Sequence, residues 1–189
     1  DTLIQSYESV LDHISDPQVL AQRCSELAEL YRSKTQQFEQ AIHRFEQSKQ
    51  GYEALFIEDY TSEVNTENIS SHYEPLAGIY NTLDELYTNA QHYPHIIDLY
   101  KQRVELLGEI EGIDNQINYL VKAAELSTQA LEDHNQAIEL YQQVLALNAQ
   151  YIPAIDALCH LHSTQGSWED VVGLLQTKET SYTDEENAE

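Results

Sequence analysis

Closely spaced histidines are the residues of this sequence whose type and spacing come nearest to a chemical site. His92 and His95 are three residues apart, and His160 and His162 are two apart. Imidazole binds metals and exchanges protons near neutral pH. A metal centre needs three or four ligands at fixed spacing, and neither HExxH nor CxxC accompanies these pairs. We therefore expect surface histidines, with no metal and no cofactor. The same expectation covers the histidines at helix ends or on polar faces: His13, His43, His72 and His134.

Other reactive side chains form no catalytic pattern. The chain has 33 Asp and Glu, so adjacent carboxylates are unavoidable, and none follows the DxDxDG spacing of a calcium loop. A GxSxG sequence and a glycine-rich phosphate loop are both missing. Cys24 and Cys159 lie on separate helical patterns, and we expect free, buried thiols. The sequence thus predicts a protein that is not an enzyme.

The charge limits the classes of partner. Lys and Arg number only 9, so the formal net charge is -24. Nucleic acids and anionic membrane surfaces are bound by positively charged proteins, so we expect neither as a partner. The expected partner is a basic or neutral protein. The alternative is that the charge serves solubility. No apolar run is long enough to insert into a membrane. Residue 1 is Asp and Met is lacking, so we expect a piece of a longer protein.

Apolar residues recur at helical spacing through almost the whole chain, as in Ile138, Tyr141 and Val144. Breaks at Asp16-Pro17 and at Gly166 separate such segments, because Pro suits the first helical turn and Gly the end of a helix. The pattern predicts an all-α protein of about nine or ten helices in antiparallel pairs.

The chain contains an internal repeat. The sequence around Ala28 and Ala41 returns 96 residues later around Ala124 and Ala137. The sequence of residues 83–100 returns after 75 residues, at residues 158–175. The offsets differ by 21 residues, which predicts an insertion in the first copy at residues 53–71. Insertions in repeat proteins form loops or longer helices on one face, often the functional face, and a neutral surface insertion is the alternative.

Residues 137–148, AIELYQQVLALN, resemble the second helix of a tetratricopeptide repeat, AIxxYxxVLxLxP. Leu158-Cys159, Gly166 and Trp168 resemble the rest of such a unit. The chain is similar to the long arrays of large bacterial scaffold proteins. The resemblance implies four units with small residues where paired helices approach. These positions hold Ala28 and Ala41, Asp84 and Ile96, Ala124 and Ala137, and Cys159 and Val171, of which Asp84 and Ile96 depart from the pattern. We expect one domain over 1–189, an α-solenoid of antiparallel helix hairpins.

In that family, partners usually lie along a groove formed by the first helix of each unit. The exposed positions of these helices, carried over from the resemblance, are nearly all small polar, amide or acidic. They are Gln22, Ser25, Glu29 and Arg32; Asn81, Glu85, Thr88 and Asn89; Asn118, Glu125, Thr128 and Gln129; and Asp156, His160 and Ser163. Glu29, Glu85 and Glu125 fall at one equivalent position, which predicts a row of carboxylates. Ordinary solvated helix faces are the alternative.

The predicted function is a protein-interaction or assembly scaffold that binds a partner segment along this polar, acidic groove. Amides would bind an extended backbone, and glutamates would pair with Lys or Arg. The alternative is a structural subunit of a large bacterial surface or periplasmic assembly that self-associates through its helical surfaces.

Overall fold

The described part of the chain is entirely helical. The computed structural model describes the backbone of residues 2–61 and 66–186, and the side chains of these residues outside 66–70 and 180–186. Within these ranges there are nine α-helices, one π-helical turn and no strand, which confirms the predicted all-α class. The chain divides into two compact units, Asp1–Gln91 and His92–Glu189. The division falls inside the predicted repeat whose small positions hold Asp84 and Ile96. The expected single domain stays a prediction.

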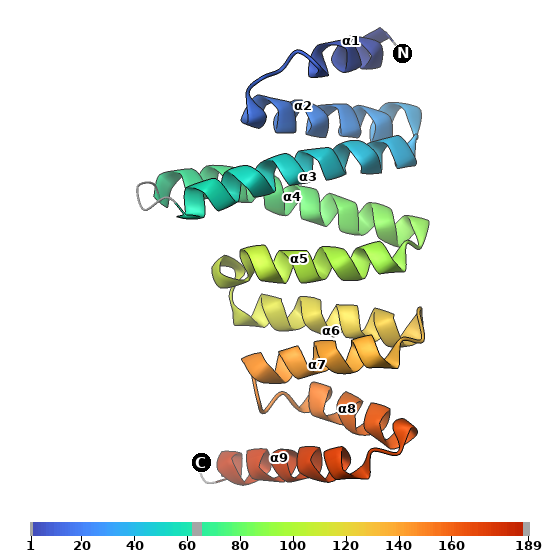
Figure 1. Ribbon diagram of the computed structural model, residues 1–189, viewed down its shortest axis with the longest axis vertical. Coiled ribbons are helices and arrows are strands. Elements are labelled where there is room, and N and C mark those ends of the chain that lie inside the picture. Colours follow the sequence, from blue (N-terminus) through green and yellow to red (C-terminus); the bar gives the residue numbers. More distant parts are fainter. Residues whose placement is uncertain (1, 62–65, 187–189) are drawn as a thin grey trace. The chain divides into compact units, whose positions relative to one another are not determined.

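The first unit consists of helices that each pack on their neighbours in sequence: α1 on α2, α2 on α3, and α3 on α4 (Figure 1). Asp16 caps α2, because its side chain accepts hydrogen bonds from the backbone nitrogens of Gln18 and Val19 at 2.9 and 3.1 Å. The elements are α1 (Thr2–Leu11), α2 (Pro17–Leu30), the π-helical turn η1 (Tyr31–Thr35), α3 (Phe38–Thr61) and α4 (Thr66–Ala90).

Small residues bring α2 and α3 together, as the resemblance implies. Ala28 and Ala41 are fully buried. At the other end of the same helix pair, a Cβ added to Gly51 would lie 2.8 Å from the Cβ of Ala21. Ser48 is also buried there and donates a hydrogen bond of 2.7 Å to the carbonyl of Ala21. Such a close approach leaves room only for very small side chains.

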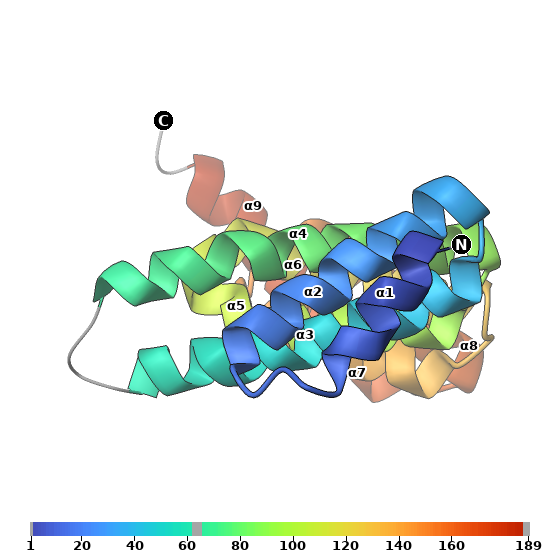
Figure 2. The ribbon, with the colours of Figure 1, turned by 90° about the horizontal axis from the view of Figure 1, so that it is seen from above.

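The region of the predicted insertion extends α3 and α4. The two helices have 24 and 25 residues, and in Figure 2 their connected ends reach beyond α1 and α2. Residues 62–65 of the insertion lie outside the described residues. The extended hairpin has its own core of Phe56, Leu76 and Tyr80, all at most 1% exposed. The Tyr80 hydroxyl donates a 2.6 Å hydrogen bond to Glu53. The added length is therefore a packed helical structure.

The second unit repeats the arrangement, and each of its helices packs on the next along the chain. Ala124 and Ala137 are fully buried between the second and third helix. Gly112 and Gly166 take positive φ angles of 86° and 76° at helix ends, where Gly has no steric cost. The helices are α5 (Tyr93–Glu111), α6 (Ile113–Gln129), α7 (His134–Leu147), α8 (Ile152–Gln165) and α9 (Trp168–Glu186).

A buried ion pair joins two residues of α5 beside α6. Arg103 and Glu111 are 2.8 Å apart, and their side chains are only 9% and 5% exposed. The Arg103 guanidinium also lies over the ring of Tyr119, 4.7 Å from its centroid. Sequence reasoning missed this pair, because eight residues separate its members on one helix. Burial makes the loss of either partner costly, since the other charge would remain without compensation.

The contact between Gly51 and Ala21 gives a first prediction. Replacing Gly51 by Leu should lower the free energy of unfolding by about 1–3 kcal/mol, because the new side chain cannot fit against α2. The matched control is Gly78→Leu on α4, where an added Cβ meets nothing within 4 Å. This control should change the free energy by at most about 1 kcal/mol, because Leu favours the helix. Urea denaturation followed by circular dichroism measures both. Equal free energies of unfolding for Gly51→Leu and Gly78→Leu would contradict the close approach of α2 and α3.

Candidate functional site

All of the predicted partner-binding side chains are exposed or half-buried. Within the first unit, α2 and η1 carry the first group and α4 carries the second. Within the second unit, α6 and α8 carry the other two groups. Three members lie on α2 and one on η1, four lie on α4, four on α6 and three on α8. Their role in binding a partner stays a prediction.

A groove of about 620 Å³ runs along part of this surface in the first unit. Gln22, Ser25 and Glu29, three of the predicted residues, line it from α2. Its other walls come from α1, α3 and α4. These walls and the rest of α2 contribute Leu3, Tyr7, Glu26, Leu30, Phe45, Tyr52, Glu74, Pro75, Gly78, Ile79 and Thr82.

The groove combines an apolar floor with a polar rim. Phe45, Tyr52 and Ile79 are at most 6% exposed and form the end of the groove that meets the core. The rim carries hydroxyl, amide and carboxylate groups, and the described lining includes neither Lys nor Arg. A site of this kind can bury an apolar side chain while its rim binds backbone or cationic groups.

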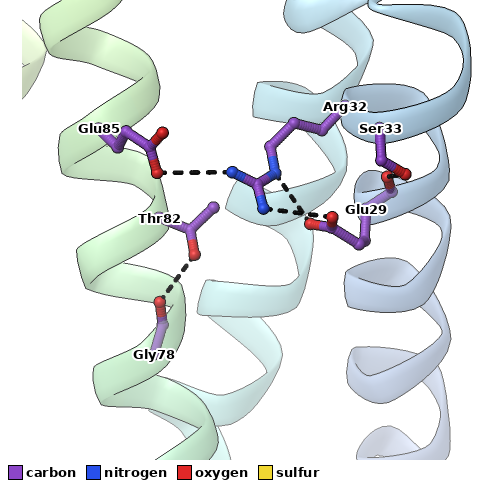
Figure 3. Close-up of polar contacts among 6 residues, drawn as sticks. All are labelled: Glu29, Arg32, Ser33, Gly78, Thr82 and Glu85. Carbon is purple, nitrogen blue, oxygen red and sulfur yellow. Dashed lines mark hydrogen bonds and ion pairs between the residues drawn. The ribbon is translucent and has the colours of Figure 1, made fainter.

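Arg32 joins two of the three carboxylates in the predicted row. Its Nε and Nη2 donate to the two oxygens of Glu29 at 2.9 and 3.2 Å, and its Nη1 lies 3.4 Å from Glu85 on α4 (Figure 3). The hydrogen bonds with Glu29 are the main cause of a raised pKa of Arg32. Glu29 and Glu85 are 47% and 62% exposed, so this bridge contributes at most about 1 kcal/mol. The third carboxylate of the predicted row, Glu125, lies in the second unit.

The turn after α2 places Arg32. Residues Tyr31–Thr35 form a π-helical turn, and Gln36 follows with a left-handed φ of 55°. A π-helical turn accommodates one extra residue and often lies at functional sites. The first unit does have one residue more in this turn than the repeat pattern needs. Arg32 therefore owes its position to a local irregularity.

Glu26 is the centre of a second polar cluster beside the groove. Its carboxylate accepts hydrogen bonds from Arg23 at 2.5 Å, Tyr7 at 3.0 Å and Gln22 at 3.1 Å. Desolvation alone would raise its pKa, but the bonds from Arg23 and Tyr7 outweigh that effect and lower the pKa of Glu26. Tyr7 belongs to α1, so this cluster links α1 to α2.

Glu74 is the third acidic residue of the groove, and within the described residues no ion pair engages it. Glu26 and Glu29 each have an arginine partner, whereas Glu74 on the α4 wall has no ion pair with a described residue. Of the three, Glu74 is therefore the best placed to attract a cationic group from a partner.

Several predicted residues of the second unit are engaged with their own helix or with the next one. Thr128 and Ser163 donate hydrogen bonds to the carbonyls of Ala124 and Cys159 at 2.9 and 2.6 Å. Asp156 forms an ion pair with Lys178 of α9. Burial is the main cause of a raised pKa of Tyr141, and the nearby charge of Glu125 adds to it. Asn118, Gln129 and His160 are exposed.

His72 differs from the sequence expectation of a surface histidine. It is 7% exposed, and its Nδ1 lies 2.6 Å from the Asp59 carboxylate, inside the extended α3–α4 hairpin. The ring of Tyr52 lies beside it, at a centroid distance of 6.3 Å. The sequence alone does not indicate this pair, because Asp59 and His72 face each other only when α3 and α4 are both extended. Cys159 likewise is half-buried, whereas Cys24 is buried as expected.

The part of the chain that the structure describes holds neither a cluster of metal ligands nor a membrane span. No three or more His, Cys, Asp or Glu side chains there lie close enough together to hold a metal ion. No described helix combines the length and the apolar character needed to cross a bilayer.

Comparisons with known proteins add little to this geometry. No protein-family profile matches the sequence, and neither does any curated protein. Among solved structures, one titled "Crystal structure of MamA" is 16% identical, with 97% of this chain and 89% of that chain covered, at a TM-score of 0.46. Another, titled "Crystal structure of MamA protein", is 14% identical, with 89% and 95% covered, at a TM-score of 0.47. These values carry no functional conclusion, and the helical-repeat fold follows from the chain's own hairpins.

The lowered pKa of Glu26 predicts how stability depends on pH. Its ordinary value is 4.5, so the stabilisation by its ionised form is fully present above about pH 4.5. The stabilisation is lost as the pH falls through the lower folded-state value. Glu26→Gln should therefore lower the urea midpoint at pH 7 and leave it unchanged in strong acid. The matched control is Glu105→Gln on the exposed face of α5. A Glu26→Gln deficit that persists at the lowest pH would contradict this origin.

Proposed function

We propose that this chain is a protein-interaction module without catalytic activity, and that the groove of its first unit binds an extended segment of a partner protein. The observation that supports this function is the joining of three predicted residues, Gln22, Ser25 and Glu29, to an apolar floor in one groove. The described lining contains neither His nor Cys, two of the side chains most used in catalysis.

The chemistry of the groove defines the partner segment. One apolar side chain of the segment inserts against Phe45, Tyr52 and Ile79. The amide of Gln22 and the hydroxyl of Ser25 bind its backbone, and a Lys or Arg next to the apolar residue pairs with Glu74. Extended segments are bound in this way when main-chain bonds supply affinity and pockets supply specificity.

The net charge of -24 acts on the same partner at longer range. A strongly negative protein attracts a basic segment and raises its association rate, and salt screens this attraction. We propose a partner segment that is basic overall. Solubility remains the alternative role of the distributed charge.

Gly78 offers a way to test the groove itself. It borders the groove on α4, and nothing lies within 4 Å of the place that a Cβ would take. Gly78→Tyr should therefore fill the groove without disturbing the helix. Gly173→Tyr on α9 is the matched control, because Gly173 is equally unobstructed and lies in the second unit.

The experiment is a selection of short peptides from a random library on the full chain, followed by fluorescence anisotropy with the enriched peptides. The enriched peptides should pair an apolar with a basic residue. Gly78→Tyr should weaken their binding at least roughly tenfold, and Gly173→Tyr should have no effect. Glu74→Gln should weaken binding roughly threefold at low salt, and Glu105→Gln, with the same charge change, should not.

Two outcomes would remove the proposed function. One is a library that yields no enriched peptide on the full chain. The other is enriched peptides that bind Gly78→Tyr as tightly as the unaltered protein, because the groove would then not be their site.

A further inference from the structure

The groove of the first unit has a carboxylate on each side of its apolar floor. On α4, Glu74 lines one end of the groove, and Glu85 lies one turn beyond Thr82, the last lining residue of this helix. At about 1.5 Å of rise per residue, Ile79 of the floor is about 7 Å from Glu74 and about 9 Å from Glu85 along the helix axis. A bound segment therefore meets one acidic end on either side of its apolar residue.

Glu74 is open to a cation from the segment. Its side chain is exposed, and no described residue forms an ion pair with it. Glu26 of α2 does not offer the same contact, because it already accepts hydrogen bonds from Arg23 and Tyr7. A Lys or Arg of the segment therefore gains an ion pair at Glu74 without displacing a cation of the protein.

At the other end, Arg32 already occupies the carboxylates. Figure 3 shows its guanidinium between Glu29 of α2 and Glu85 of α4. It donates to both oxygens of Glu29 at 2.9 and 3.2 Å, and its Nη1 lies 3.4 Å from Glu85. A cation of the segment would meet this guanidinium at the point where the two carboxylates converge. Like charges placed side by side oppose binding.

The local structure keeps Arg32 in place. Its two hydrogen bonds to Glu29 follow the planar fork of the guanidinium, which fixes the side chain better than a single contact would. The side chain is only 33% exposed. The π-helical turn that carries Arg32 is tied to α2 by the hydroxyl of Ser33, which donates a 2.7 Å hydrogen bond to the carbonyl of Glu29. Arg32 is therefore a fixed part of this end of the groove.

The two ends differ in local contacts and not in formal charge. Glu74 contributes one negative charge. Glu29, Glu85 and Arg32 together also leave one negative charge. Both ends therefore attract a basic segment similarly at long range. In contact, a cation pairs with Glu74 directly, whereas at the other end it must compete with Arg32.

We propose that Arg32 makes the groove selective for segments with a basic residue on only one side of the apolar residue. An extended chain advances about 3.3 Å per residue, so this basic residue lies two or three positions from the apolar one, next to Glu74. A basic residue on the other side gains no ion pair, because Arg32 fills the place that it would take. Arg32 is thus a specificity-determining residue. This inference rests on the proposed binding of a segment in the groove.

The experiment compares two peptides by fluorescence anisotropy on the full chain. Both are built on a peptide enriched in the library selection, with one Leu and two Lys. In the two-sided peptide, one Lys lies two positions before Leu and the other two positions after it. In the one-sided peptide, the second Lys is moved to the far end of the side that already has one, so the net charge is unchanged. One-sided peptides are made in both orders, because the direction of binding is not fixed.

The unaltered protein should bind the two-sided peptide and the better one-sided peptide with dissociation constants within about twofold of each other. Arg32→Gln frees Glu29 and Glu85 and should bind the two-sided peptide at least roughly threefold more tightly than the one-sided peptide. The ratio of the two constants is the readout, because a general structural effect of the substitution would weaken both peptides alike.

Two control variants separate the position of Arg32 from its charge. Arg32→Lys keeps a cation between the carboxylates and should keep the ratio of the unaltered protein. Lys34→Gln removes the same charge from an exposed residue of the same turn and should also leave the ratio unchanged.

The outcomes distinguish this inference from the proposed function. An unaltered protein that already prefers the two-sided peptide, or an Arg32→Gln variant that binds both peptides equally, would overturn the role of Arg32 and leave the groove as a binding site. Peptides that bind Gly78→Tyr as tightly as the unaltered protein would remove the groove as their site, and the role of Arg32 with it.

Discussion

The close approach of paired helices at buried alanines is the constraint from which the other features follow. Ala28 meets α3 through Ala41 in the first unit, and Ala124 meets α7 through Ala137 in the second, all four without exposed surface. Helices that pack at such short distances bury whole faces, where a charged group is tolerated only when it is paired, as Arg103 and Glu111 are. Acidic residues therefore gather on the outer faces and at the rims.

The chain has only 9 Lys and Arg, and several of those at the edges of helix pairs hold carboxylates in place. Arg32 holds carboxylates on α2 and α4, Arg23 holds Glu26 beside α1, and Lys178 holds Asp156 between α9 and α8. Exposed pairs of this kind contribute little energy each and weaken with salt. These pairs determine which carboxylates have no cationic partner. Among the described residues of the groove, that carboxylate is Glu74.

The fold was predictable from the sequence because its causes are local. The Asp16 cap and the glycine at 166 each act on the backbone within a few residues, and the small residues at repeat spacing join helices that follow one another in the chain. The polar contacts were not predictable, because they depend on how far helices extend and how turns close. The pairing of His72 with Asp59 needs the lengthened α3–α4 hairpin, and the reach of Arg32 to Glu85 needs the π-helical turn. One residue more or less in either segment would separate these partners.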